Sequence, residues 1–218
     1  MMGAVHLRAA LAALVACCVV ASAGHAAERP ASALARAGRI ECEKGRRAES
    51  RDERAQHFTR GRNLAEQAVA VDEESAAAHF ALFCNLGELM RLDGESITSV
   101  FALRRLMSEL DRTLALDPGN TDALASKGTL LIRLPRLLGG DPQRGEQLLR
   151  QVIAQDPNAV TSRLTLAKTC EARGEREEAL AFARRALQVA RAQGRADKVA
   201  EAQATLAELG AASVASPR

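Results

Sequence analysis

Three cysteines are the most reactive side chains in the body of this sequence, and their spacing limits the chemistry that they can do. Cys42, Cys84 and Cys170 lie far apart, and no C-x-x-C pair occurs that would indicate a thioredoxin-like redox site or a zinc site. In an oxidising compartment, two of the three can form a disulfide and leave one free thiol. The alternative is that all three pack in the core as small apolar residues.

The histidines are the next candidates for catalysis or metal binding. His57 and His79 fall on different predicted helices, and neither has an acidic residue or a cysteine at a suggestive spacing; His25 joins them if the N-terminal segment is cut before it. The sequence also lacks H-E-x-x-H, G-x-S-x-G and a glycine-rich phosphate-binding loop. We therefore predict a protein that is not an enzyme and that has no cofactor or metal ion.

Charge and aromatic content argue against nucleic acid as a partner. Lys and Arg number 30 and Asp and Glu 27, so the formal net charge is only +3. The basic segment 36–62 interleaves arginine with acidic residues, and its one aromatic residue is Phe58. Nucleic acids and membrane surfaces are bound by concentrated positive charge, and single strands also by stacked aromatic rings. We expect neither as a partner.

The N-terminal segment has the features of an export signal. Arg8 is followed by an uncharged, mostly apolar run that ends in small residues at Ala23. Such a run is too short to span a bilayer comfortably and is typical of a cleaved signal peptide. Residues 1–23 are therefore predicted to be a signal peptide, cut so that the mature chain starts between Gly24 and Glu28. The expected location is the bacterial periplasm.

The same segment also contains a signal for a second processing route. The letters LVAC at 14–17 resemble a bacterial lipoprotein box, which would place a lipid anchor on Cys17. In that case the apolar stretch CVVASAG would follow the anchor directly. Cleavage after Ala23 would instead remove both Cys17 and Cys18. Both routes predict an exported protein.

The rest of the chain is predicted to be helical. From Pro30 onward apolar residues recur at helical spacing, and no segment alternates apolar and polar residues as a strand would. Aromatic residues make up 2% of the chain, so Ala, Leu and Val must fill the core, which favours closely packed helices. Three segments also end alike: AEQAVAVDEES, LDRTLALDPGN and LLRQVIAQDPN. We predict an all-α domain of paired helices over 31–211 and a flexible tail over 212–218.

The last helix pair shows the repeat without insertions. In VTSRLTLAKTCEARGEREEALAFARRALQVAR, the small residues Ala167, Gly174, Ala179 and Ala186 stand where paired helices would touch. This pattern resembles the tetratricopeptide repeat (TPR) family, whose unit is about 34 residues of helix, turn and helix. The resemblance implies a superhelical solenoid of about four such units plus a C-terminal capping helix. Gly145 departs from it, because the family usually has Ala at that position.

The stretch RLPRLLGGDPQRGEQLL interrupts one predicted helix pair. Pro135 should end the first helix, and Asp141 followed by Pro142 should cap and begin the second. Gly139 and Gly140 can adopt the positive φ values of a tight reversal. The interruption is thus predicted to be an elongated hairpin turn. It also resembles, over few residues, an insertion in the helical partner subunit of some tripartite periplasmic (TRAP) transporters.

In the TPR family, the first helices of successive units line a groove that holds peptides or protein segments. Carrying this lining over by matching positions gives six candidate partner-binding residues, Phe80, Glu88, Arg133, Leu164, Lys168 and Glu171. The other matching positions are Ala77, Cys84, Asp122, Ala125, Thr129 and Thr161. These positions lack the concentrated Lys, Arg and Asn that would clamp a terminal carboxylate.

The function implied by this resemblance is recognition. We expect a non-enzymatic exported scaffold or adaptor that binds a segment of a protein partner. The alternative is a periplasmic helical subunit that is associated with a transporter or binds a small ligand. The sequence favours no particular oligomeric state.

Overall fold

The computed structural model describes residues 30–92 and 100–211, and within these ranges every regular element is helical. The predicted export signal, the lipid-anchor site at Cys17 and the tail at 212–218 lie outside them. None of the helices in the described part is long and apolar enough to cross a membrane. The elements are α1 Pro30–Arg47, α2 Arg51–Val71, α3 Ala76–Leu92, α4 Val100–Leu116, α5 Thr121–Arg133, the short 3-10 helix η1 Arg136–Leu138, α6 Pro142–Gln155, α7 Val160–Ala172, α8 Arg176–Ala192 and α9 Ala196–Ala211.

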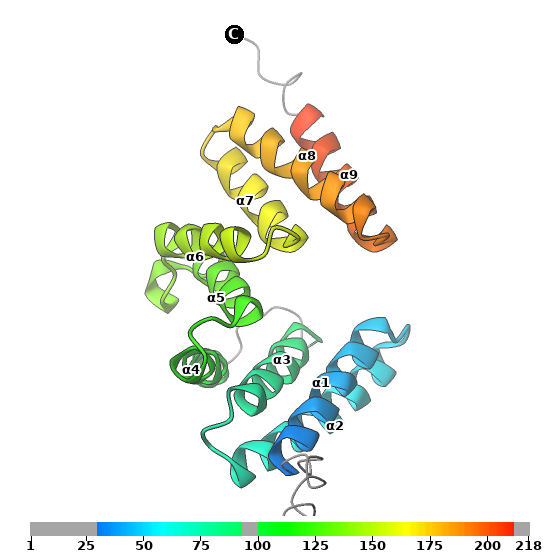
Figure 1. The fold of residues 1–218 in the computed structure, drawn as a ribbon, viewed down its shortest axis with the longest axis vertical. Coiled ribbons are helices and arrows are strands. Elements are labelled where there is room, and N and C mark those ends of the chain that lie inside the picture. The colour runs from blue at the N-terminus through cyan, green and yellow to red at the C-terminus, as the bar shows by residue number, and fades with distance from the viewer. Residues whose placement is uncertain (1–29, 93–99, 212–218) are drawn as a thin grey trace, which may run out of the picture.

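Consecutive helices pack as four hairpins that follow one another along the molecule. These are α1 with α2, α3 with α4, α5 with α6 and α7 with α8, and α9 packs against α8 at the C-terminal end (Figure 1). Two pairs of first helices from neighbouring hairpins also touch, α1 with α3 and α5 with α7. The predicted all-α solenoid of four helical pairs plus a C-terminal capping helix is confirmed for the described residues.

The three similar endings in the sequence form the same turn in the structure. In each, the carbonyl of Asp72, Asp117 or Asp156 accepts a hydrogen bond from the N–H three residues later, at 3.2, 3.2 and 3.1 Å. The carboxylates of Asp72 and Asp156 also accept the N–H two residues later. Aspartate stops the second helix of each of the first three hairpins because its side chain offers the backbone a local partner outside the helix.

The interruption between α5 and α6 has the predicted helix ends. The backbone before Pro135 is extended, and the Asp141 carboxylate accepts the N–H three residues later at 3.0 Å as an N-cap. Gly139 has a φ of +90°, as predicted. The prediction of a positive φ for Gly140 is wrong. A Cβ on Gly140 would lie 1.8 Å from the carbonyl oxygen of Leu134, so this glycine is needed for a close approach of two backbones.

Helices within the hairpins approach closely at small residues. A Cβ built on Gly145 of α6 would lie 2.5 Å from the carbonyl oxygen of Gly128 of α5. A Cβ on Gly128 would in turn lie 2.8 Å from the carbonyl oxygen of Gly145. In the last hairpin, Ala167 and Ala186 have no exposed surface, as predicted from their spacing. Small side chains thus set the distance between paired helices.

Candidate functional site

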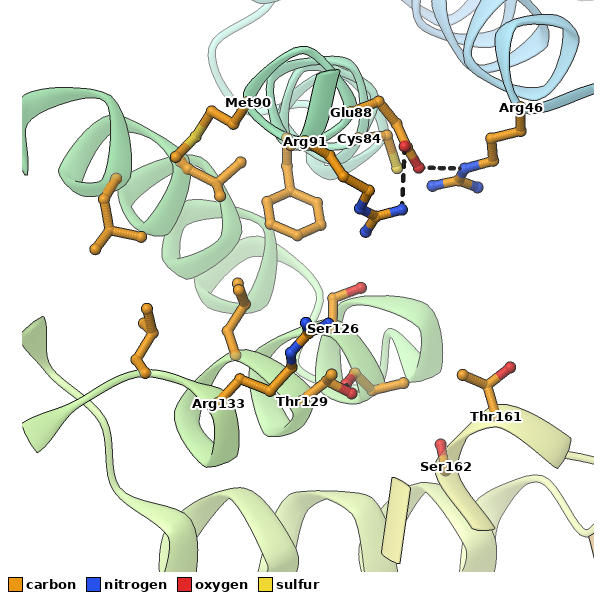
Figure 2. Close-up of a pocket in the computed structure, with 17 residues that line it drawn as sticks. Arg46, Cys84, Glu88, Met90, Arg91, Ser126, Thr129, Arg133, Thr161 and Ser162 are labelled. Carbon is orange, nitrogen blue, oxygen red and sulfur yellow. Dashed lines mark hydrogen bonds and ion pairs between the residues drawn. The ribbon is translucent and has the colours of Figure 1, made fainter. Parts of the chain in front are cut away.

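The first helices of the four hairpins share a cavity of about 490 Å³, which we call the groove. It lies mainly between α3 and α5, with further lining from α1, α4 and α7 (Figure 2). Six of its lining residues are among the twelve positions that the repeat register predicted, Cys84, Glu88, Ala125, Thr129, Arg133 and Thr161. Residues far apart in the sequence therefore meet at one surface.

The charged side of the groove is built around a buried glutamate. Only 3% of Glu88 is exposed, and its carboxylate accepts hydrogen bonds from Arg46 Nε at 2.6 Å and from Arg91 Nη1 at 3.1 Å. The two arginine side chains are 51% and 59% exposed, so their guanidinium groups stay in contact with solvent. Arg133 projects from α5 toward the same space as Arg91 (Figure 2). The sequence did not single out Arg46 or Arg91, because their role depends on how α1 and α3 pack.

The opposite side of the groove is apolar. Phe83 and Met90 come from α3, Leu103 and Leu106 from α4, and Leu130 from α5. Phe83 and Leu106 also belong to the hydrophobic cluster between these helices. The contribution of α4 was not predicted, because the family resemblance assigns the lining to first helices only. The groove thus offers one cationic and one apolar wall to whatever it binds.

With the geometry known, comparisons identify the architecture. Residues 136–198, less than half of the chain, match the tetratricopeptide repeat family. The crystal structure of MamA has 16% sequence identity and a TM-score of 0.52, with 77% of this chain and 82% of that chain covered. The fold is a TPR solenoid. At this level of identity the likeness shows the fold alone.

Two further solved TPR-like structures are more distant in shape. The MamA RS-1 double mutant is 14% identical, with 84% of this chain and 98% of that chain covered and a TM-score of 0.48. YrrB, described as a TPR protein with an unusual peptide-binding site, is 16% identical, with 68% and 84% covered and a TM-score of 0.38. No curated protein sequence matches this chain.

Two of the six predicted partner-binding residues lie in the core of the TPR solenoid. Phe80 is 4% exposed, because the guanidinium of Arg39 lies 4.8 Å from the centre of its ring and Phe83 stacks beside it. Arg39 is held there by Asp122 of α5, 3.6 Å away. Leu164 is 2% exposed in the cluster of α7, α8 and α9. Neither side chain is presented on the groove surface, which corrects the position expected for them.

The other four predicted residues are divided between two places on the TPR solenoid. Glu88 and Arg133 line the groove together. Lys168 is exposed on α7, and Glu171 of the same helix lies 3.6 Å from Arg176 of α8, but neither lines the groove. The binding role of all four stays a prediction.

The histidines do have acidic partners, contrary to the prediction from the sequence. His79 Nδ1 lies 2.7 Å from Glu109 Oε2, and its Nε2 lies 3.0 Å from the carbonyl oxygen of Glu73. His57 Nδ1 lies 2.8 Å from Glu41 Oε2. Each partner comes from a neighbouring helix or turn, so the sequence spacing gave no sign of it. Because His79 bridges α3, α4 and the turn before α3, we interpret it as a structural contact between repeats.

All three cysteines are buried free thiols, as the packing alternative predicts. Cys42 of α1 and Cys84 of α3 belong to the same buried cluster. The interaction with Cys84 raises the pKa of Cys42, with burial adding to the shift, and the interaction with Cys42 lowers the pKa of Cys84. The pair therefore connects the first helices of the first two repeats directly beneath the groove.

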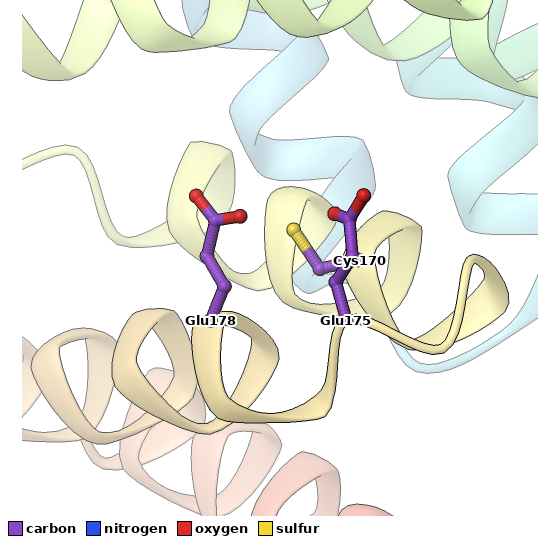
Figure 3. Close-up of side chains that lie close together, drawn as sticks. All are labelled: Cys170, Glu175 and Glu178. Atoms are coloured by element: carbon purple, nitrogen blue, oxygen red, sulfur yellow. The ribbon is translucent and has the colours of Figure 1, made fainter.

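Cys170, Glu175 and Glu178 lie close enough together to suggest a cation site (Figure 3). Both carboxylates already have partners, since Arg173 binds Glu175 at 2.5 Å and Arg150 binds Glu178 at 2.7 Å. Burial raises the pKa of Cys170 to about 11, so the thiol is protonated at neutral pH. We therefore interpret this cluster as part of an ion-pair network that joins α6, α7 and α8.

Proposed function

We propose that this protein is a non-enzymatic scaffold or adaptor that holds a segment of a partner protein in its groove. The observation that carries the proposal is the groove itself, an open cavity of about 490 Å³ to which the first helices of four successive repeats contribute. A cavity of this size accommodates several side chains. Stacked helical repeats commonly bind partners along such a shared surface, since equivalent positions of successive repeats lie next to one another.

Filling the groove should weaken recognition strongly without unfolding the protein. Thr129 lines the middle of the groove, and its hydroxyl donates a hydrogen bond to the carbonyl of Ala125 within its own helix. We expect Thr129→Trp to reduce capture of the native partner from a cell-envelope extract by about tenfold or more, which corresponds to about 1.4 kcal/mol of binding free energy. Quantitative mass spectrometry of the captured proteins measures this.

The matched control for the filled groove is Thr165→Trp. Thr165 makes the same bond to the carbonyl four residues earlier, on α7, and does not line the groove. Proteins that the control captures and Thr129→Trp loses are the groove partners. If both variants capture the same proteins as the unmodified chain, recognition takes place elsewhere. A ligand-induced thermal shift that only Thr129→Trp abolishes would instead favour the transporter-associated or small-ligand alternative.

The proposal includes export to the bacterial periplasm, which rests on residues 1–23 of the sequence. We expect the intact mass of the protein recovered from expressing cells to correspond to a soluble chain that starts between Gly24 and Glu28. A diacylated chain starting at Cys17 would replace this with the lipoprotein route. A chain that still begins at Met1 would contradict export altogether.

A further inference from the structure

Two of the three buried cysteines lie together between the first helices of the first two repeats. Cys42 of α1 and Cys84 of α3 share one hydrophobic cluster, in which they are 1% and 7% exposed. Cys170 belongs to a separate cluster formed by α7, α8 and α9. The interaction between Cys42 and Cys84 is also the largest influence on the pKa of each thiol. These two cysteines therefore form a pair.

Direct bonds between α1 and α3 lie on both sides of this pair. Gly38 precedes Cys42 by one helical turn, and its carbonyl accepts an N–H from the side chain of Asn85 at 3.0 Å. Arg46 follows the cysteine of α1 by one turn, and its Nε donates to Glu88 at 2.6 Å. Glu88 in turn lies one turn beyond the cysteine of α3. Residues four positions apart share one face of a helix, so the two thiols lie along a contact that is bonded at each end.

The groove gives access to one thiol of the pair. Cys84 lines the groove, where Figure 2 shows it beside Glu88, whereas Cys42 is almost completely covered. The interaction with Cys42 lowers the pKa of Cys84, and the positive charges of Arg39 and Arg46 lower it further, while burial acts in the opposite direction. The thiolate is the reactive form of cysteine. Cys84 is therefore the thiol that should react first, from the side of the groove.

We propose that Cys42 and Cys84 are a thiol–disulfide site, at which an external disulfide oxidises the pair and so joins α1 covalently to α3 beneath the groove. The thiolate of Cys84 attacks one sulfur of the external disulfide, which forms a mixed disulfide and releases one thiolate. The thiolate of Cys42 then attacks the sulfur of Cys84 and releases the second. The two cysteines lose two electrons and two protons, and the external disulfide takes them up as two thiols.

Formation of this bond does not depend on partner binding, and so it is independent of the function proposed above. It requires only a source of disulfides, which an oxidising compartment such as the proposed periplasm provides. The bond would close the loop between positions 42 and 84, which contains the whole of α2. A disulfide that closes a loop of this kind restricts the unfolded chain and thereby stabilises the folded one.

The test incubates the folded full chain with oxidised glutathione, alkylates the remaining thiols and maps the tryptic peptides by mass spectrometry. Lys and Arg residues separate these three cysteines in the sequence, so each lies in its own tryptic peptide. We expect the peptides of Cys42 and Cys84 to be linked to each other. The peptide of Cys170 should carry the alkylating label. Dithiothreitol should separate the linked peptides, because thiol–disulfide exchange is reversible.

Unfolding tests whether the bond fits the native structure. The thermal midpoint of the oxidised chain should exceed that of the reduced chain by about 5 °C or more. Cys84→Ala should have the same midpoint with and without oxidised glutathione, whereas the control Cys170→Ala should keep the full difference. Each variant is compared with itself, so a loss of stability caused by the substitution does not affect the result.

Several outcomes would overturn the inference. Glutathione that stays attached to Cys84 without a link to Cys42 would mean that the pair cannot close. Links from either cysteine to Cys170 or to a second copy of the chain would mean that the two thiols do not meet. A link between Cys42 and Cys84 that forms only after urea has unfolded the chain, or that lowers the midpoint, would mean that native packing opposes the bond. Three unreacted thiols would have the same meaning.

Discussion

Replacing Gly145 with alanine is expected to destabilise the protein by about 2 kcal/mol, even though alanine is the better helix former. Helix propensity alone would favour the alanine by about 1 kcal/mol. In this structure, however, the new methyl group would lie 2.5 Å from the carbonyl oxygen of Gly128 and 2.8 Å from Cγ1 of Ile132. The oxygen belongs to the backbone of α5 and cannot rotate away, so the two helices must separate, and overpacking typically costs about 1–3 kcal/mol.

The measurement for Gly145→Ala is urea unfolding followed by circular dichroism, with Gly87→Ala as control. Gly87 is also inside a helix, but its new methyl group would meet only Cδ1 of Leu106 at 3.6 Å, an ordinary contact. The control should therefore be stabilised by up to about 1 kcal/mol. If Gly145→Ala is stabilised as well, the glycine pair does not set the distance between α5 and α6.

Replacing Ala186 with leucine should destabilise the C-terminal repeats by about 1–3 kcal/mol. Ala186 of α8 has no exposed surface and packs in one cluster with Val160 and Leu164 of α7 and Ala202 of α9. Three helices meet at this side chain, so no open space adjoins it that could accommodate the larger leucine. Interiors of this density respond to even a single added methylene group.

The control for Ala186→Leu is the same substitution at Ala181, an exposed position of the same helix. Surface substitutions of this kind usually change stability by less than about 0.5 kcal/mol. Denaturant midpoints of the two variants are compared with that of the unmodified chain. Equal midpoints for the two variants would mean that α8 is rotated relative to the arrangement described above.

Local signals in the sequence were sufficient for the helices and their ends. Three kinds of signal act within a few residues of the chain: apolar residues at helical spacing, aspartate after α2, α4 and α6, and proline and Asp141 around the long turn. For this reason the sequence predicted the repeat register, and the register predicted six of the residues that line the groove. Gly140 shows the limit of such signals. It must be glycine because the carbonyl oxygen of Leu134 leaves no room for a side chain, and only the folded turn brings that oxygen near.

Tertiary structure decided which side chains the groove presents. The path of the solenoid brings Arg39 of α1 to Asp122 of α5, and this ion pair covers Phe80, which the repeat register had placed on the binding surface. The same path places Arg46 against Glu88 and so assembles the cationic wall. The bond between Arg46 and Glu88 joins residues 42 positions apart. Sequence periodicity determines which face of a helix turns inward, but the curvature that sums over several repeats determines which inward side chains remain open to a partner.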